Sequence, residues 1–348
     1  MSLADSLGAL RTAVQELVRA PARPPLWTRI DPARVDRPPE SGPLDPGRDY
    51  FEVRINHLHL AYGRKWFSQF TPVVFVAAEF THDGAQAVVP AMVGPGLIQR
   101  HGAETPQGIV IANTRVAGPQ PTPPGGLALS VVLYRLQTGD TAQPFLDVLQ
   151  GAAGALDLAA GLAPYTALAK VVVGGVNALV GGDQPVLARR DEFEPGLRPA
   201  YYALIGPGDG VDPAGLHVRD GELAERIDGR LVPLRDVDYV LYSVARVRPE
   251  DVDVTRLPLY RVWQDVVQQA TEAVTDERWL GTKAAMATLT GLLYSSPDLT
   301  WAHAESIQEH WTDVMVDLRE RALRLAHLSG ARTAPDRARS RALAVLDL

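Results

Sequence analysis

Two histidines lie two positions apart in a strand-like segment. His57 and His59 occur in FEVRINHLHLAY, which begins at residue 51. Alternate side chains of a β-strand project from the same face, so two imidazoles at this spacing could bind one metal ion. A further ligand would have to come from Glu79, His82 or His101 on a neighbouring strand. The spacing is common, however, and we expect these histidines to lie on the solvated side of a sheet.

A second histidine pair lies near the C-terminus. His303 and His310 are seven residues apart and therefore share one face of a helix, with Glu305, Glu309 and Asp313 nearby. Such a cluster could sense pH or bind a metal ion. A solvated helix face with charge pairs explains the same residues more simply, and we expect that arrangement.

The local signatures of common enzymes are missing. The chain has no cysteine, which excludes disulfide bonds, Cys-ligated zinc, iron–sulfur clusters and a thiol nucleophile. It has no Walker A sequence, no dinucleotide-binding glycine pattern between a strand and a helix, and no G-x-S-x-G, S-x-x-K or H-E-x-x-H motif. We therefore expect no cofactor and no catalysis. An enzyme with a non-local site, centred on His57 and His59, is the alternative.

Composition limits the class of protein. The chain has 348 residues, of which 46% are hydrophobic and 22% charged, enough to build a sizeable core. Its net charge of −7 argues against nucleic acid as the main partner. Charged residues at positions 5, 11, 16 and 19 interrupt residues 1–20, which predicts an amphipathic helix rather than a signal peptide. Together with an excess of arginine over lysine, this favours a cytosolic bacterial protein.

The middle of the chain has the pattern of an antiparallel β domain. Residues 21–50 are rich in proline and predict a linker or arm, which Trp27 could anchor. Within residues 51–248, the apolar phase shifts near Asn56, which predicts a β-bulge, and PVVFVAAEF predicts a strand covered on both faces. Asp-Gly pairs predict hairpin turns at 83–84, 220–221 and 228–229. The segment VAGPQPTPPGG is expected to be a loop.

The least polar stretch interrupts this β pattern. Residues 141–180 predict a helical hairpin whose second helix carries an apolar stripe that includes Val171, Val172, Val176 and Leu179. Its 16 residues from 165 to 180 would extend about 24 Å, against about 30 Å for a bilayer core, and include Lys170. We expect the hairpin to cover the sheet. The alternative is a membrane-active effector that inserts residues 144–180 after a conformational change.

The last hundred residues predict helices over residues 255–330. SSPDLTW predicts a helix start with Ser296 as N-cap, and an apolar stripe at alternating steps of three and four follows. The stripe could bind the preceding helices, a second copy or another protein; its candidate contact residues are Trp301, Gln308, Trp311, Met315, Leu318 and Leu325, with Ala304 and Ala322 as smaller members. Several arginines, Arg319 among them, form a basic stretch placed at an exposed helix end, and an Arg-rich tail covers residues 331–348.

These patterns together predict an α+β protein. Its body is an antiparallel β-sandwich-like domain interrupted by a helical hairpin and followed by a C-terminal helical region. The heptad-like stripe and the missing catalytic signatures favour a non-catalytic assembly or adaptor protein. We expect it to act through a protein partner or as a homo-oligomer.

Overall fold

The computed structural model describes residues 25–61, 64–65, 68–93, 108–109, 114–137, 185–193, 196–207 and 211–328. Antiparallel sheets and three helices make it an α+β protein, as predicted. The chain divides into two units, Met1–Asp251 and Val252–Leu348, which we call the β unit and the helical unit. The predicted N-terminal helix (1–20), helical hairpin (141–180) and Arg-rich tail (331–348) lie outside the described residues.

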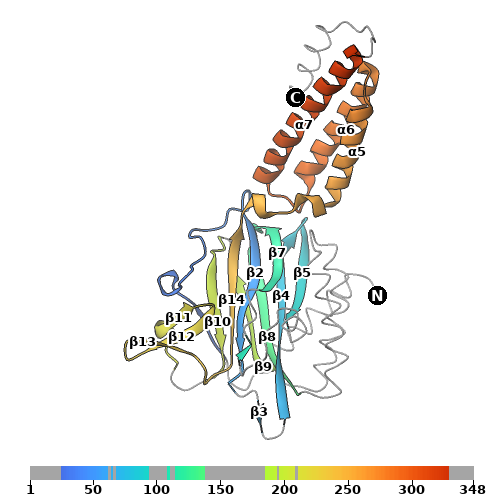
Figure 1. Ribbon diagram of the computed structural model, residues 1–348. Helices are drawn as coiled ribbons and strands as arrows, with labels where there is room; N and C mark the ends of the chain where they lie inside the picture. The colour runs from blue at the N-terminus through green and yellow to red at the C-terminus, as the bar shows by residue number, and fades with distance from the viewer. Residues whose placement is uncertain are drawn as a thin grey trace. The chain divides into compact units, whose positions relative to one another are not determined.

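The first sheet of the β unit has six strands (Figure 1). In spatial order they are β1 (Leu26–Arg29), β10 (Ala200–Ile205), β14 (Tyr239–Val247), β2 (Tyr50–His59) and β6 (Gly108–Ile109), with β7 (Thr114–Pro121) also paired to β2. The register between β2 and β14 shifts by one residue, because Ile55 faces Tyr242 while His57 faces Leu241. The predicted bulge at Asn56 is therefore confirmed, and it resets the side of the sheet to which the following residues point.

Part of the segment predicted as a linker or arm belongs to this sheet. Strand β1 pairs with β10, and the Trp27 indole nitrogen donates a hydrogen bond to the Tyr242 hydroxyl at 2.8 Å. The Trp27 ring also stacks on Tyr202, with centroids 5.7 Å apart. These contacts attach residues 26–29 to the body of the β unit.

The second sheet has five strands. Its order is β3 (Arg64–Lys65), β4 (Ser68–His82), β8 (Leu127–Gln137) and β9 (Pro185–Phe193), and β5 (Ala85–Val93) also pairs with β4. Val73 to Ala78 of β4 are fully buried, which confirms the predicted covered strand. Asp83 and Gly84 both have positive φ at the turn into β5, as a tight hairpin requires. Residues of both sheets share one buried core, in which Phe51 and Phe80 meet edge to face.

The proline-rich segment expected to be a loop contains most of strand β7, so that expectation is wrong for residues 116–121 and confirmed for residues 122–126. Among the described strands β7 pairs only with β2, so its prolines are not required to donate a hydrogen bond to a second neighbour. Gly118 has a φ of +86°, and a Cβ there would lie 2.3 Å from the Phe51 carbonyl oxygen. Only glycine fits so close to the neighbouring strand.

A small three-stranded meander completes the described β unit. It consists of β11 (Leu216–Arg219), β12 (Glu222–Ile227) and β13 (Arg230–Pro233), joined by the two predicted Asp-Gly turns, where Asp220 and Asp228 have positive φ. The short helix η2 (Pro213–Gly215) directly precedes it in sequence, whereas η1 (Pro32–Arg34) is distant in sequence and is followed by Val35, which forms a bridge to Val218. Leu216, Val218 and Leu223 share a second buried cluster with β10 and β14. The meander therefore covers one face of the first sheet.

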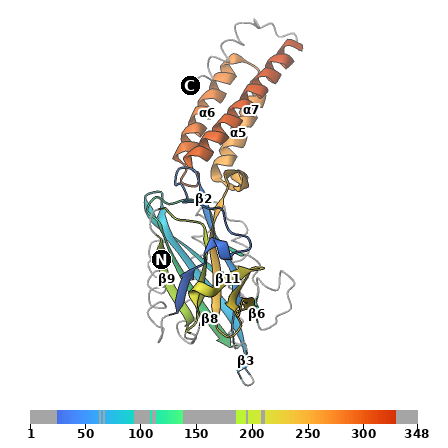
Figure 2. The same ribbon diagram turned by 90° about the vertical axis from the view of Figure 1, so that its left-hand side faces the viewer.

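The helical unit is a bundle of three helices (Figures 1 and 2). After η3 (Pro249–Asp251), which still belongs to the β unit, come η4 (Val254–Arg256), α5 (Pro258–Glu272), α6 (Asp276–Ser295) and α7 (Trp301–Leu328). Proline at the first position of α5 and a Thr275 side-chain cap on α6 are favourable helix starts. Trp263, Val266 and Ala270 of α5 are buried, as are Leu289 and Leu293 of α6.

The start of α7 differs from the prediction. Ser296 is the C-cap of α6, and its N–H donates to the Leu293 carbonyl oxygen at 3.3 Å. Thr300 lies at the start of α7, where its hydroxyl accepts from the His303 N–H at 3.3 Å and its carbonyl from the Ala304 N–H at 2.9 Å. Pro297 and Asp298 form the turn between the two helices, so the N-cap lies four residues later than predicted.

Candidate functional site

The predicted stripe on α7 is divided between the interior and the surface of the helical unit. Trp311 and Met315 are buried, and Trp311 stacks on Trp263 of α5 with ring centroids 4.6 Å apart and planes 3° from parallel. Gln308 is half-buried and accepts a hydrogen bond from the Tyr294 hydroxyl of α6 at 2.5 Å. The middle of the stripe therefore packs against α5 and α6, which was one of its three possible partners.

The ends of the stripe are exposed. Trp301 is 64% exposed and contacts the Tyr294 ring on one side, with centroids 4.6 Å apart. Leu325 is 62% exposed, and Leu318 is half-buried. Trp301 and Leu325 are thus accessible to another molecule, whereas Trp311 and Met315 contribute to the bundle itself.

Two sequence expectations for α7 are wrong. Arg319 is buried rather than part of an exposed basic end: it donates to the Ala273 carbonyl oxygen at 3.2 Å, pairs with Asp276, and lies 5.1 Å from the Trp279 ring centroid. His303 is also buried, although a solvated face was expected for it and His310. Because α7 packs against two helices, its buried face is wider than a single stripe.

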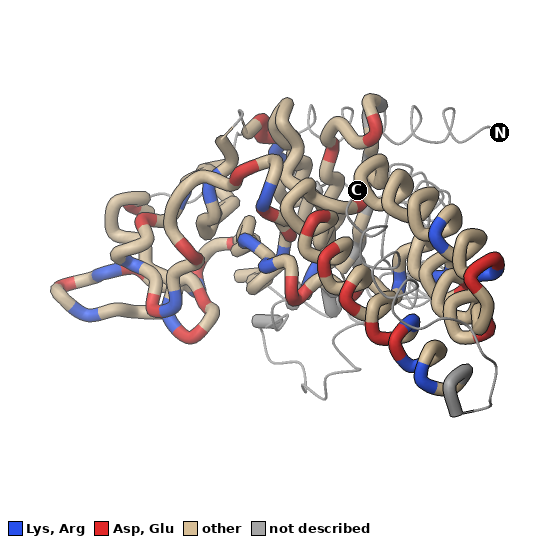
Figure 3. The backbone as a smooth tube through the Cα atoms, turned by 90° about the horizontal axis from the view of Figure 1, so that it is seen from above, with Lys and Arg blue, Asp and Glu red and all other residues tan. Residues whose placement is uncertain are grey.

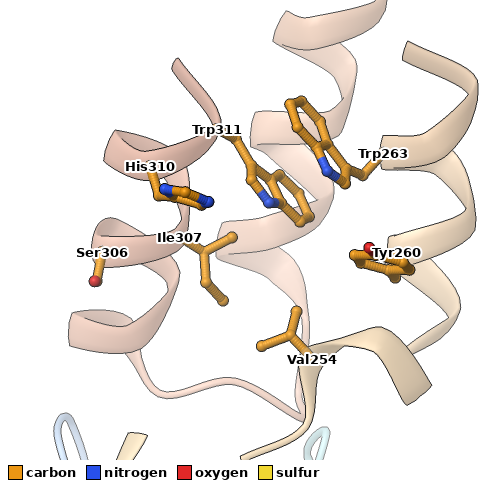
Figure 4. A pocket seen from close by; sticks show the side chains of 7 residues that line it. All are labelled: Val254, Tyr260, Trp263, Ser306, Ile307, His310 and Trp311. Carbon is orange, nitrogen blue, oxygen red and sulfur yellow. The ribbon is translucent and has the colours of Figure 1, made fainter. Parts of the chain in front are cut away.

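A groove lies between α5 and α7 (Figure 4). It has a volume of about 360 Å³. Its walls are Val254, Tyr260 and Trp263 on the η4 and α5 side, and Ser306, Ile307, His310 and Trp311 on the α7 side. The α5–α7 groove therefore combines aromatic and aliphatic surface with polar atoms from residues such as Tyr260, Ser306 and His310.

The α7 edge of this groove continues into an acidic row (Figure 3). Ser306, His310, Asp313 and Asp317 follow each other at steps of four, three and four, so they share one face of the helix. Glu305 and Glu309 add two carboxylates, one position before Ser306 and His310. All four carboxylates are exposed, and within the described residues none of them forms an ion pair.

The exposed side of α6 is also unusual. Leu280 is 62% and Leu292 43% exposed, and the chain has no charged residue from Ala284 to Ser295. The α6 outer face, as we call it, consists of Leu280, Ala284, Ala287, Thr288, Gly291 and Leu292. Solvated helix faces normally carry charges, so a face of this composition is typical of a helix that contacts another surface.

The β unit places the first histidine pair in its interior. His57 is fully buried and His59 is 3% exposed, so the expectation that they lie on the solvated side of a sheet is wrong. Both rings pack against Tyr239 of β14, with centroids 5.3 and 5.4 Å away. The cause is the meander, whose Glu222 comes within 3.7 Å of His57.

Burial keeps both histidines neutral. His59 Nε2 lies 2.8 Å from the Arg235 carbonyl oxygen, but neither ring nitrogen of His57 has a hydrogen-bond partner in the described part of the chain. Burial lowers the pKa of His57 to about 3, and the nearby His59 and Arg235 charges act in the same direction. Burial also lowers the pKa of His59. Glu222, the nearest acid to His57, pairs with Arg235 at 2.6 Å.

The proposed metal ligands do not converge in the region that is described. No group of three or more His, Asp or Glu side chains there is placed to hold a metal ion. Glu79 instead pairs with Arg190 at 3.4 Å on the second sheet, and His82 packs against Phe80. His101 lies outside the described residues. The structure therefore brings His57 together with His59, Tyr239 and Glu222.

The membrane hypothesis concerns residues outside the described ranges: Val171, Val172, Val176 and Leu179. Among the helices that are described, none is long and apolar enough to cross a membrane.

The chain matches no known protein family, no curated protein and no solved structure.

Several residues of these sites were missed by the sequence patterns. Val254 precedes α5, and Tyr260 lies in the first turn of α5. Nothing in their spacing indicates a groove with α7. The α6 outer face had a detectable signal, since no charge occurs over twelve consecutive residues, 284–295, of a helix. The row Ser306, His310, Asp313 and Asp317 was likewise visible as a heptad-like spacing.

Proposed function

We propose that this protein is a non-catalytic, cytosolic bacterial assembly or adaptor protein that binds other protein chains through its helical unit. We further propose that the α6 outer face joins two copies of the chain. The observation that carries the proposal is the exposure of Leu280 and Leu292 on α6, a helix with no charged residue over positions 284–295.

The bundle does not need this face for its own packing. Its interior is filled by other side chains, including Trp263, Leu289, Trp311 and Met315. Burying an exposed leucine is worth about 1.5–3 kcal/mol, and a two-fold contact buries each residue of the face twice. The small residues Ala284, Ala287 and Gly291 would allow two α6 helices to approach closely.

The β unit then serves as a scaffold. Two sheets with a shared core support its interpretation as a sandwich-like domain. The contacts of His57 and His59 with Tyr239 favour a packing role for this pair over catalysis.

The test is the mass of the full chain in solution, measured by size-exclusion chromatography with light scattering. We expect a discrete oligomer for the natural sequence and a monomer for Leu280→Glu/Leu292→Glu, with the same helical circular dichroism. Gln264→Glu/Gln268→Glu, which adds two charges at exposed positions of α5, is the matched control and should remain oligomeric. A natural chain that is monomeric at all concentrations up to hundreds of micromolar would contradict the proposed self-association.

A further inference from the structure

The α5–α7 groove has the chemistry of a site for a cationic side chain. Resting on the proposed role as a protein-binding molecule, we propose that this groove binds a basic segment of a partner protein and takes one arginine side chain of that segment. Further basic residues of the segment would lie along Asp313 and Asp317.

The lining of the groove fits an arginine side chain. A volume of about 360 Å³ exceeds that needed by one such side chain. Val254 and Ile307 offer aliphatic surface to its methylene groups, and Tyr260 offers an aromatic ring from the opposite wall. A guanidinium group stacks on aromatic rings while donating hydrogen bonds in its own plane, and Ser306 contributes a hydroxyl at the α7 rim of the groove.

The charges around the groove select a cation over an anion. Asp313 and Asp317 continue the α7 edge beyond His310, whereas Glu305 and Glu309 lie about 100° round the helix, on the side away from Ile307 and Trp311. Repeated carboxylates at steps of four repel one another along a helix, so a basic partner would relieve an unfavourable arrangement.

The opposite edge adds little positive charge to oppose that field. The exposed α5 positions Gln264, Gln268 and Thr271 are uncharged. Arg256, which precedes α5, is paired with Asp253 at 2.9 Å. The nearby arginine of α5 itself is Arg261, next to Tyr260. The unpaired carboxylates of Asp313 and Asp317 therefore outweigh the single arginine nearby, and an acidic partner would be repelled.

The experiment measures binding of fluorescent peptides to the full chain by fluorescence anisotropy. The probe is acetyl-Gly-Arg-Leu-Arg-Leu-Arg-Gly-amide, compared with peptides that carry glutamine or glutamate in place of arginine. We expect the arginine peptide to bind at least about tenfold more tightly than the glutamine peptide, and the glutamate peptide not to bind. Equal binding of the arginine and glutamine peptides, or no binding at low salt, would overturn the proposal.

Variants separate the groove from general charge attraction. Asp313→Asn/Asp317→Asn and, independently, Tyr260→Leu should each weaken binding of the arginine peptide about fivefold or more. Glu272→Gln/Glu277→Gln removes two exposed carboxylates elsewhere in the bundle and should change binding less than about twofold. Loss of binding in the Asp313/Asp317 variant but not in Tyr260→Leu would mean surface attraction alone and would reject the groove. Circular dichroism checks that each variant is folded.

Two further outcomes distinguish this proposal from its alternatives. Leu280→Glu/Leu292→Glu should still bind the arginine peptide. A failure of self-association can therefore be distinguished from a failure of peptide binding to the groove. The basic residues 331–348 of the chain itself are another possible occupant. Peptide binding that appears only in the variant Arg337→Glu/Arg339→Glu/Arg341→Glu would show that this segment occupies the groove. That result would contradict the proposed binding of an external partner.

Discussion

Acid should destabilise the β unit through His57. This side chain is fully buried against Tyr239, and neither of its ring nitrogens has a hydrogen-bond partner within the described residues. Its pKa is about 3 in the folded protein, against an ordinary value of 6.5. The unfolded chain therefore binds one more proton than the folded chain between these two values. Stability is retained above pH 6.5 and is lost as the pH falls toward 3.

The size of the effect follows from that difference in pKa. Each pH unit between the two pKa values costs about 1.4 kcal/mol of the free energy of unfolding. Allowing for partial protonation near pH 6.5, the loss between pH 7 and pH 5 is about 2 kcal/mol. The pKa of His59 is lowered by burial as well, so this residue acts in the same direction.

Hydrogen exchange measured by mass spectrometry can isolate this effect, because peptides from β2 and β14 report on the β unit alone. After correction for the intrinsic exchange rate, their protection should fall by about 25-fold from pH 7 to pH 5. In His57→Leu the fall should be clearly smaller, since the leucine cannot take up a proton. The partly exposed His217 on β11 is the control, and His217→Gln should leave most of the pH dependence unchanged. An unaltered pH dependence in His57→Leu would refute the assignment to this residue.

Two substitutions in the helical unit, each compared with an exposed control, test its packing. Unfolding in urea is followed by circular dichroism at the helical band. Trp311→Ala would leave a cavity against Trp263 and should lower the free energy of unfolding by about 3–5 kcal/mol. Trp301→Ala, at the exposed start of α7, should lower it by less than about 1 kcal/mol. Arg319→Met should cost about 1–3 kcal/mol, because it leaves the buried Ala273 carbonyl oxygen without its donor and removes the guanidinium from the Trp279 ring. Arg321→Met at an exposed position should be nearly neutral, and equal effects of the two arginine variants would contradict the buried role of Arg319.

Local patterns predicted local features of the fold well. The phase shift near Asn56 identified the bulge in β2, and the pairs Asp83-Gly84, Asp220-Gly221 and Asp228-Gly229 identified three hairpin turns. Each of these features depends on a few consecutive residues, because backbone conformation at a turn or bulge is limited by the residues that occupy it. The sequence therefore carried these features directly.

Burial of the histidines could not be read from the strand that carries them. The bulge set the side to which His57 and His59 point, but the sequence of β2 does not say what covers that side. Glu222 comes from the meander and Arg235 from the segment that follows it, both more than 160 positions later, and Tyr239 comes from β14. Only the assembled sheet and meander decide that both imidazoles lose their contact with water and are held neutral.

The α+β class, the strand character of β2, β4 and β14, the helical character of α5 and α6 and the absence of cysteine chemistry all follow from the residues themselves. It also placed an apolar stripe on α7, because spacing along one helix reports which residues share a face. Tertiary structure decided which parts of that stripe remain accessible: Trp311 stacks on Trp263 and Arg319 turns inward to Asp276, while Trp301 stays at the surface. The physical reason is that a periodic pattern records a preference for burial, whereas the partner that satisfies it comes from elements distant in the chain.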